Sequence, residues 1–551
     1  MTIGSLLLQP FTLLVISVAS WVFLRSRKSK SSFSLKNIPG PGARSWWKGN
    51  FWEALNATTA WEFHQKLLKE FEPVVRLDGM LGDETLFTYD PKVMHHVLVK
   101  DQAAFRRTNM TTSDLMFGKG LTAIAGEAHR KQRKALNPVF SIAHMRDMLP
   151  VFYDVIHKFD IGLSSQLGKS NEPREIELLS WSSRVAFELI GQAGLGYSFD
   201  ELKDEVEVHP YPRVMKEIAP TAARMTISRN YILPITAKFG SRKLWRWVLD
   251  TIPWEDGRRM KNISDYLWEF SRELYRGKTR ALAAGDEAVT RQVGKGKDIM
   301  SILIKLNLEA KEEDRLSEDE VLGQMSILMF AAVDTTSTAI SRTLHLLATH
   351  PHVQDKLREE LIEARRENED IPYDTLVSLP YLDAICRETL RLFSPAPYVL
   401  RHATRDTILP LSNPIKGVDG TTVSEIHVPG DTRILVSIIN SNRNPAIWGP
   451  DAHEWKPERW LSPLPSSLIE AHIPGIYSHL MTFNAGGRAC IGFKFSQLEM
   501  KAVLSMLVAK FKFAPSKKEV VWKMNDILTP TVNGEARSQM PMVVSRVDST
   551  A

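Results

Sequence analysis

The residues best suited to chemistry lie in a glycine-rich segment around one cysteine, Phe483-Asn484-Ala485-Gly486-Gly487-Arg488-Ala489-Cys490-Ile491-Gly492. The two adjacent glycines allow a tight turn and a close approach to a flat ligand. Cys490 would precede a helix N-terminus, where free N–H groups and the helix dipole favour a thiolate over a thiol. Such a thiolate is a nucleophile or a metal ligand, and no local Cys-His signature marks a nucleophile. For a haem one thiolate suffices, and Arg488 can reach a propionate. A buried cysteine in a glycine turn remains the alternative.

The overall composition narrows the class of protein. The chain has 551 residues, of which 43% are hydrophobic and 24% charged, as in an ordinary globular protein. The net charge of +6 is too small to argue for nucleic-acid binding. Cys386 and Cys490 are the only cysteines, which excludes a disulfide framework, a four-cysteine zinc site and a cysteine-ligated iron–sulfur cluster.

The spacing F-x-x-G-x-R-x-C-x-G resembles the haem-binding signature of the cytochrome P450 family, the haem-thiolate monooxygenases. The resemblance implies that haem b is the cofactor and that Cys490 is the axial ligand of its iron. Phe483, Gly486 and Arg488 would then belong to the haem-binding segment. Further segments match the family in its order along the chain, which looks most like the fungal microsomal members.

A long apolar helix with polar groups at its centre is predicted over 317–349. Ser317 and Glu320 form a capping box at its start. Its middle, Met329 to Ser337, holds an aspartate and three hydroxyls, which are costly in such a stretch unless they find partners or water. One interpretation is that the hydroxyls bond back to their own helix.

The other interpretation is that this stretch resembles the family's oxygen-activation motif, [AG]-G-x-[DE]-T-[TS]. Asp334 and Thr335 match the acid and alcohol of that motif, and the resemblance implies that they deliver protons. Ala332 stands where glycine is usual, and we expect it to narrow the groove above the iron.

Glu388 and Arg391 give the pattern E-x-x-R, with both side chains on one face of a helix. The surrounding helix is apolar enough to be buried, and a buried ion pair needs a third partner. The segment from Pro457 is similar to the family's P-E-R-F, with Trp460 for phenylalanine as a conservative replacement. Arg459 would complete a structural cluster behind the haem. Cys386, on the same helix, is predicted to be a small core residue.

Basic residues are predicted to hold the haem propionates. The helix segment from Gly126 looks like the family's W-x-x-x-R, with His129 in the tryptophan place and Arg133 in the arginine place. Arg401 matches another propionate-binding arginine, and Arg488 is the third. The alternative for His129 is a role as iron ligand.

Hydrophobic periodicity indicates a mainly α fold with small β-sheets, and not an alternating βαβ array. Helices are predicted over 140–167, 176–195, 263–283, 317–349, 353–367, 378–393 and 493–511. Strands are predicted near 73–89 and 423–439. The resemblance implies the cytochrome P450 fold, a single large catalytic domain.

The N-terminal residues predict a membrane anchor. Residues 3–24 carry no charge and as a helix would span about 33 Å, enough for a hydrocarbon core of about 30 Å. A basic flank follows, so the positive-inside rule leaves the body on the cytoplasmic side. We expect a single-pass anchor at 1–25, a basic and Pro/Gly hinge at 26–42 and the catalytic domain at 43–551, in the endoplasmic reticulum membrane. A cleaved signal peptide is the alternative.

The resemblance implies hydroxylation or oxidation of a lipophilic small molecule with O₂. Electrons would come from an NADPH-cytochrome reductase, a flavoprotein, or from a cytochrome b-type donor, and no nucleic acid is involved. A terpenoid or other fungal secondary metabolite is the first candidate substrate, with fatty acids and xenobiotics as alternatives. The expected pocket walls are 105–121, Phe330, 395–400 and 528–532.

Two other classes of protein stay open. A haem-thiolate isomerase or dehydratase would need neither O₂ nor a reductase, and the Asp334-Thr335 pair argues against it. A non-catalytic haem sensor is the other. For the oxygenase, we expect Lys131, Lys134 and Lys494 to form a basic face that docks the reductase.

Overall fold

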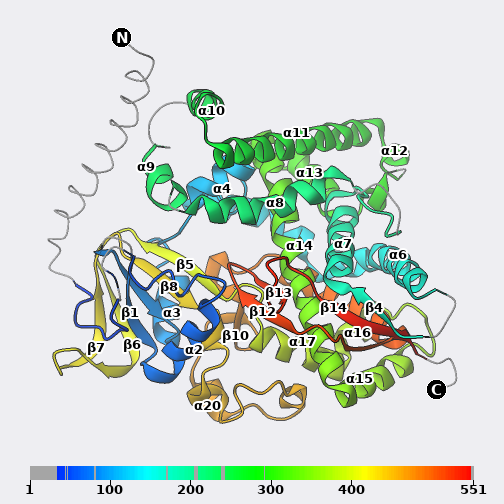
Figure 1. Cartoon of the computed structure of the whole chain (residues 1–551). Coiled ribbons are helices and arrows are strands. Elements are labelled where there is room, and N and C mark those ends of the chain that lie inside the picture. Colours follow the sequence, from blue (N-terminus) through cyan, green and yellow to red (C-terminus); the bar gives the residue numbers. More distant parts are fainter. Residues whose placement is uncertain are drawn as a thin grey trace.

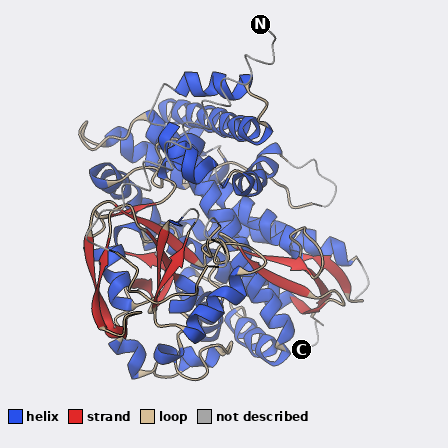
Figure 2. Ribbon diagram, turned by 60° about the vertical axis from the view of Figure 1, so that its left-hand side comes forward, coloured by secondary structure: helices blue, strands red, loops and turns tan. Residues whose placement is uncertain are grey.

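The computed structural model describes residues 34–43, 45, 48–79, 82–168, 172–203, 209–226, 228–236, 242–290 and 292–547. Helices make up most of this part of the chain, and the strands gather in two groups on opposite sides of the helical body (Figures 1 and 2). The helices of eight or more residues are α2 (Ala60–Glu70), α4 (Met110–Phe117), α5 (Gly126–Leu136), α6 (Ile142–Leu167), α7 (Leu178–Leu189), α8 (Pro210–Arg224), α10 (Arg242–Thr251), α11 (Glu255–Ala284), α13 (Ile299–Glu309), α14 (Glu318–Thr349), α15 (Pro351–Ala364), α17 (Pro380–Leu392) and α21 (Phe493–Lys510).

The largest sheet has the strand order β1-β2-β8-β5-β3. It is formed by β1 (Val74–Asp78), β2 (Glu84–Thr88), β8 (Arg433–Ser437), β5 (Tyr398–Ala403) and β3 (Phe105–Arg107). β2 and β8 pair in parallel, and the other neighbours pair antiparallel. This sheet therefore joins segments from the first and last thirds of the chain.

The remaining sheets are small. A three-stranded sheet has the order β11-β14-β4, and three hairpins pair β6 with β7, β9 with β10 and β12 with β13. Their bounds are β4 (Arg174–Glu177), β6 (Thr407–Lys416), β7 (Thr422–Val428), β9 (Gly475–Tyr477), β10 (Leu480–Ala485), β11 (Phe511–Pro515), β12 (Val520–Met524), β13 (Leu528–Val532) and β14 (Pro541–Arg546).

Helix α14 forms the centre of the helical body. It packs against α7, α11, α17 and α21, and most of its residues are buried. The capping box predicted from Ser317 and Glu320 is confirmed, with the Ser317 side chain accepting from the Glu320 amide and the Glu320 carboxylate accepting from the Ser317 amide. The helix ends at Thr349, directly before His350 and Pro351. A long helix that is mostly buried and packed on several sides can fix the positions of the side chains at its middle.

Most of the predicted elements are confirmed within a few residues. The helices expected over 140–167, 317–349 and 493–511 are α6, α14 and α21, and both strand regions are present. The helix expected over 176–195 differs: it starts at Leu178 as α7 and continues from Ile190 to Leu195 as a π-helix. Gly191 and Gly194 lie in that last turn, and glycine lowers the preference for a regular α-helix.

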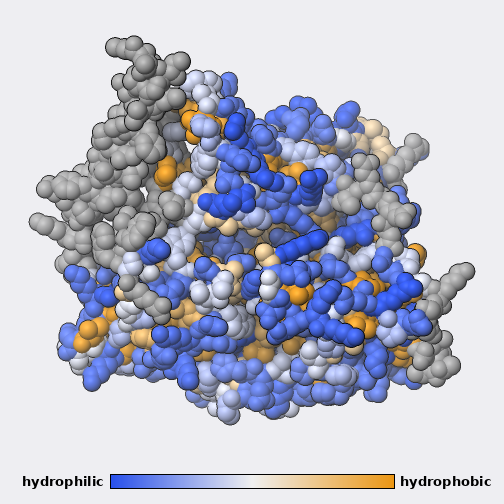
Figure 3. Space-filling model, in the orientation of Figure 1, coloured by the Kyte–Doolittle hydropathy of each residue, from blue (hydrophilic) through white to orange (hydrophobic). Residues whose placement is uncertain are grey.

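The predicted anchor at 1–25 and residues 26–33 of the hinge lie outside the described residues. Within the described ranges, no helix is both long enough and apolar enough to cross a membrane. The face of the molecule in Figure 3 is mainly hydrophilic, with small, scattered hydrophobic patches. Isolated apolar residues on a surface are normal in globular proteins.

Candidate haem-thiolate active site

The cysteine segment forms a closed loop between β10 and α21. The Cys490 amide donates a hydrogen bond of 2.9 Å to the Phe483 carbonyl oxygen, which ties the two ends of the loop together. Gly486 has φ +64°, and a Cβ built on it would lie 2.1 Å from the carbonyl oxygen of Leu98. The prediction of a tight turn is confirmed, and at Gly486 the lack of a side chain also allows a close approach to the backbone of Leu98.

Phe483 supports this loop from the protein interior. Its ring packs against Tyr477 at 5.3 Å and Phe493 at 6.0 Å, and its side chain is nearly fully buried. Such edge-on and tilted aromatic contacts fix ring orientation as well as burying apolar area. The structure therefore places Phe483 as a support for the cysteine loop.

Cys490 differs from an ordinary surface cysteine. Its side chain is exposed, yet burial raises the pKa of its thiol, and from these two observations we infer that the thiol lies in a recess of the protein. The hydrogen bond from Gly492 and the charge of Arg133 lower that pKa in smaller measure. The expected net lowering by the helix N-terminus was therefore wrong, because desolvation is the larger effect. A bound metal cation would remove the thiol proton outright.

Cys386 is a different kind of cysteine. It lies within α17, is 3% exposed and belongs to the main hydrophobic core, as predicted. Burial raises the pKa of its thiol to about 12. Since a metal ligand must be both deprotonated and reachable, Cys490 is the better candidate of the two.

A short window of α14 is accessible in the middle of a buried helix. The residues from Val321 to Met329 and from Thr336 to Ser341 are buried, whereas Ala331 is exposed and its neighbours up to Thr335, apart from Val333, are partly accessible. The window is the predicted oxygen-activation segment. A helix buried on both sides of an accessible stretch indicates that this stretch also borders an interior space.

The hydroxyl of Thr335 fits both interpretations of this segment, a bond back to its own helix and a role in oxygen activation. Thr335 Oγ1 donates 2.7 Å to the carbonyl oxygen of Ala331, one turn earlier, so the hydroxyl is held by its own helix. The same residue is partly accessible and can still accept a hydrogen bond from water or ligand. Burial raises the pKa of Asp334, and the charge of Lys216 on α8 opposes the shift. A carboxyl with a raised pKa is suited to exchanging protons.

The predicted propionate-binding residues converge on the cysteine loop. Arg133 Nη1 donates 2.6 Å to the Ala489 carbonyl oxygen, next to Cys490. Arg488 donates to the carbonyl oxygens of Leu121 and Ile124, which links the loop to the segment before α5. Burial and the charges of Arg488 and Arg133 lower the pKa of His129 to about 4, so its ring is neutral near pH 7.

Arg401 joins this group from the large sheet. It is 5% exposed, and burial together with the charges of Arg107 and Arg488 lowers its pKa to about 9. Arg107, on β3, was not predicted from the sequence. It lies at the register position directly opposite Arg401 on β5. Arg106 and Arg107 are adjacent in the segment 105–121, which was expected to line the pocket. Two neighbouring arginines at that place are the sequence signal that could have identified Arg107.

These cations fit a haem. Burial lowers the pKa of each of Arg107, Arg133, Arg401 and Arg488, although only Arg401 is buried and Arg107 keeps an exposed side chain. No carboxylate among the described residues acts on the pKa of any of the four. A group of like charges at such positions is costly unless anionic groups offset their charge. The two propionates of haem b supply two negative charges, and the accessible Cys490 thiol supplies the iron ligand.

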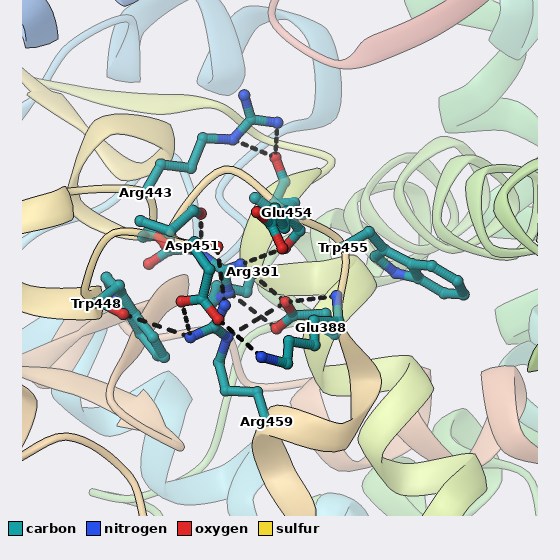
Figure 4. Close-up of polar contacts among 12 residues, drawn as sticks. Glu388, Arg391, Arg443, Trp448, Asp451, Glu454, Trp455 and Arg459 are labelled. Atoms are coloured by element: carbon teal, nitrogen blue, oxygen red, sulfur yellow. Dashed lines mark hydrogen bonds and ion pairs between the residues drawn. The ribbon is translucent and has the colours of Figure 1, made fainter.

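Glu388, Arg391 and Arg459 form one buried network, as the sequence implied (Figure 4). Arg391 binds both carboxylate oxygens of Glu388, at 2.8 and 2.9 Å, and Arg459 lies 3.4 Å from one of them. The Trp460 indole also donates 2.9 Å to Glu388, which a phenylalanine could not do. The replacement of phenylalanine by Trp460 is therefore not simply conservative.

Comparisons with known proteins show the family of this chain. The sequence profile described as Cytochrome P450 matches residues 39–536. The chain is 50% identical to cytochrome P450 monooxygenase 91 of Postia placenta over 94% of this chain and 95% of that protein. It is 46% identical to cytochrome P450 monooxygenase 81 of the same fungus over 96% of each chain. It is 40% identical to a ganoderic acid synthetase of Ganoderma lucidum over 94% of each chain. The chain belongs to the cytochrome P450 family of haem-thiolate monooxygenases.

Proposed function

We propose that the protein oxidises a lipophilic small molecule, with a terpenoid as the first candidate, at a haem held by Cys490. One observation carries the proposal: an accessible thiol, Cys490, lies beside a cluster of arginines, Arg107, Arg133, Arg401 and Arg488, on whose pKa values no carboxylate of the described residues acts. The haem, when bound, supplies the reductive activation of O₂. Arg107, Arg133, Arg401 and Arg488 would bind its propionates.

We propose that Asp334 and Thr335 transfer protons in this site. The Thr335 hydroxyl is fixed by its bond to Ala331 and keeps accepting capacity toward the interior space. Asp334, whose pKa is raised by burial, would exchange protons with solvent and pass them on. An isomerase or dehydratase would not need this pair.

The substrate class rests on two supports. Phe117 of α4 and Phe330 of α14 pack with ring centroids 4.8 Å apart, and both lie in expected pocket walls. An aromatic wall of this kind suits a rigid apolar molecule. The second support is the relative from Ganoderma lucidum, which is a ganoderic acid synthetase. Fatty acids and xenobiotics are the alternative substrates.

A test of the substrate class uses the purified holoenzyme with an NADPH-dependent reductase. Terpenoids, fatty acids and aromatic xenobiotics are screened by the spin-state shift of the ferric Soret band and by products under O₂. We expect a shift and an oxygenated product with a terpenoid. Turnover of a terpenoid without O₂ and reductase would overturn the monooxygenase proposal in favour of an isomerase. Turnover of fatty acids alone would overturn the substrate class.

The electron donor is proposed to dock on the basic face of Lys131, Lys134 and Lys494. Lys134 already pairs with Asp314 at 3.0 Å, but both side chains are largely exposed and such a pair is weak. We expect Lys131→Glu and Lys494→Glu to slow haem reduction by the reductase, most strongly at low ionic strength. Unchanged reduction rates in both variants would contradict this docking face.

We also propose that residues 1–25 anchor the protein in the endoplasmic reticulum membrane with its catalytic domain in the cytoplasm. The uncharged run of residues 3–24 and its basic flank support this. The full chain should sediment with microsomes and resist carbonate extraction, and a chain lacking residues 1–25 should not. Equal extraction of both chains would contradict the anchor.

A further inference from the structure

A hollow between α7 and α8 contains none of the residues that were expected to line the substrate pocket. α8 runs alongside α11 (Figure 1), and Arg259 of α11 also lines the hollow. Its volume is about 550 Å³, and ligand pockets usually have volumes of about 300–1,000 Å³. Phe187 of α7 and Pro212 and Pro220 of α8 give it an apolar wall. The hollow is therefore large enough for part of a lipophilic ligand.

The charged residues of this hollow are mainly cations. Five lysine or arginine side chains line it, together with two carboxylates. Three of these cations are paired, namely Arg184 with Asp200 at 2.7 Å, Arg224 with Asp256 at 2.8 Å and Arg259 with Glu217 at 3.0 Å. The other two, Arg213 and Lys216, form no ion pair or hydrogen bond through their side chains among the described residues. The hollow therefore carries two positive charges that no ion pair offsets.

Arg213 and Lys216 can act together on one ligand. They are three residues apart on α8, so they lie on the same face of the helix, about one turn from each other. Both side chains are exposed and can rotate toward a ligand. The hydrogen bond from Arg259 is the main cause of the lowered pKa of Glu217, and the charge of Arg213 contributes less. A carboxylate, which has two acceptor oxygens, fits two cations at this spacing.

Lys216 also links the hollow to the accessible window of α14. Burial raises the pKa of Asp334 in that window, and the charge of Lys216 opposes the shift. Among the described residues, Lys216 is the one that both lines the hollow and acts on the pKa of Asp334. A carboxyl with a raised pKa is protonated for a larger part of the time, so it is a weak counter-ion. A ligand at Lys216 therefore lies next to the window and meets a positive charge that Asp334 offsets only in part.

We propose that this hollow binds the carboxylate of the substrate, and that the substrate is a lipophilic carboxylic acid held by Lys216 and Arg213 with its apolar body directed toward the window of α14. The acid supplies the counter-charge that the two cations lack, and Phe187 covers part of the apolar body. No covalent bond forms or breaks at this site. The inference rests on the proposed function and narrows its substrate class from lipophilic molecules in general to acids, with a terpenoid acid as the first candidate.

The test measures binding to the ferric holoenzyme, without reductase and without turnover. The probes are oleanolic acid, which is a pentacyclic triterpenoid carboxylic acid, the matching primary alcohol, palmitate and hexadecanol. Titration calorimetry gives each dissociation constant, and the spin-state shift of the Soret band reports arrival at the haem. We expect oleanolic acid to shift the band and to bind about three- to tenfold more tightly than the alcohol, with a smaller preference at high salt.

Three variants separate the ion pair from other effects. We expect Lys216→Gln to remove most of the preference for the acid, and Lys216→Arg to keep it because the charge is retained. Arg258→Gln is the matched control, since Arg258 is an exposed arginine of α11 that lines a neighbouring hollow and not this one. This control should leave the preference unchanged.

Each other outcome overturns a different part of the account. No binding of either acid, equal binding of acid and alcohol, or a preference that survives in Lys216→Gln would overturn the carboxylate site and leave the monooxygenase function standing. An equal loss of preference in Arg258→Gln would assign it to general surface charge and would also overturn the site. Binding of the acid that depends on Lys216 but leaves the Soret band unshifted would overturn its role as substrate. A Lys216-dependent preference shown by palmitate alone would keep the site and overturn the terpenoid class.

Discussion

Arg107 and Arg401 lie directly opposite each other on β3 and β5, two cations at paired positions of neighbouring strands. Like charges at such positions destabilise a sheet. The charge of Arg107 contributes, with burial, to lowering the pKa of Arg401 to about 9. A bound dianion would attract both arginines and offset their repulsion. The pair therefore strengthens ligand binding but destabilises the protein without the ligand.

Arg107→Met is expected to have opposite effects on the protein with and without haem. A hydrogen bond to a charged group contributes about 1.5–3 kcal/mol, so the variant should lose haem roughly ten- to a hundredfold more readily. The haem-free variant should be at least as stable as the haem-free wild type, because one repulsive charge is gone. Haem transfer to apomyoglobin and thermal unfolding measure the two effects.

Arg106→Met is the matched control for that experiment. Arg106 precedes Arg107 on the same strand, so its side chain points to the other face of the sheet, opposite His402. It should leave haem retention unchanged. Equal haem loss in both variants would show that the effect comes from general charge and not from the Arg107–Arg401 pair.

Glu388→Gln should destabilise the fold strongly. The change leaves Arg391 and Arg459 buried without the carboxylate that pairs both, and removing one partner of a buried pair costs about 3–5 kcal/mol. Glu363→Gln is the control, because Glu363 and Arg366 have the same i, i+3 spacing but are 63% and 70% exposed. We expect the control to lose less than about 1 kcal/mol in urea unfolding. Similar losses in the two variants would contradict a special role for the buried network.

Thr335→Val should uncouple the enzyme without changing its fold. The hydroxyl that can face water or ligand is lost, so product per NADPH should fall and peroxide should rise. Thr343→Val is the control, since Thr343 makes the same bond back to its helix, 2.8 Å to Ala339, at a fully buried position. Peroxide release that rises equally in both variants would assign the effect to helix distortion.

The protein should lose stability as the pH falls from about 6.5 toward 4. Burial lowers the pKa of His64 from 6.5 to about 4, so the unfolded chain takes up a proton that the folded chain refuses. His64 therefore contributes stability that is present above pH 6.5 and decreases below it, by at most about 3 kcal/mol. The urea midpoint measured from pH 7 to 4 should fall less steeply in His64→Gln. An identical slope would show that other groups dominate.

Short sequence patterns predicted the site residues that lie close together along the chain. The cysteine loop, the Asp334-Thr335 pair and the Glu388–Arg391 pair each lie within a few residues, so a short pattern contains them. The position of Arg107 opposite Arg401 depends on the pairing of β3 with β5, which lie almost three hundred residues apart in the sequence.

The direction of the Cys490 pKa shift also depends on tertiary structure and could not be predicted from the local sequence. The sequence indicates a helix N-terminus after the cysteine, which lowers a thiol pKa, but it does not indicate how much water is excluded. Burial proved the larger effect. Likewise, the role of Gly486 could be predicted as a turn, but not as a contact with Leu98.

The most direct test is the carbon monoxide difference spectrum of the dithionite-reduced protein, with Cys490→Ser and Cys386→Ala beside the wild type. We expect the red-shifted Soret band of a thiolate-ligated haem in the wild type and in Cys386→Ala, and its loss in Cys490→Ser. A band that survives in Cys490→Ser, or that is missing from folded, haem-loaded wild type, would contradict the assignment of Cys490 and the mechanism built on it.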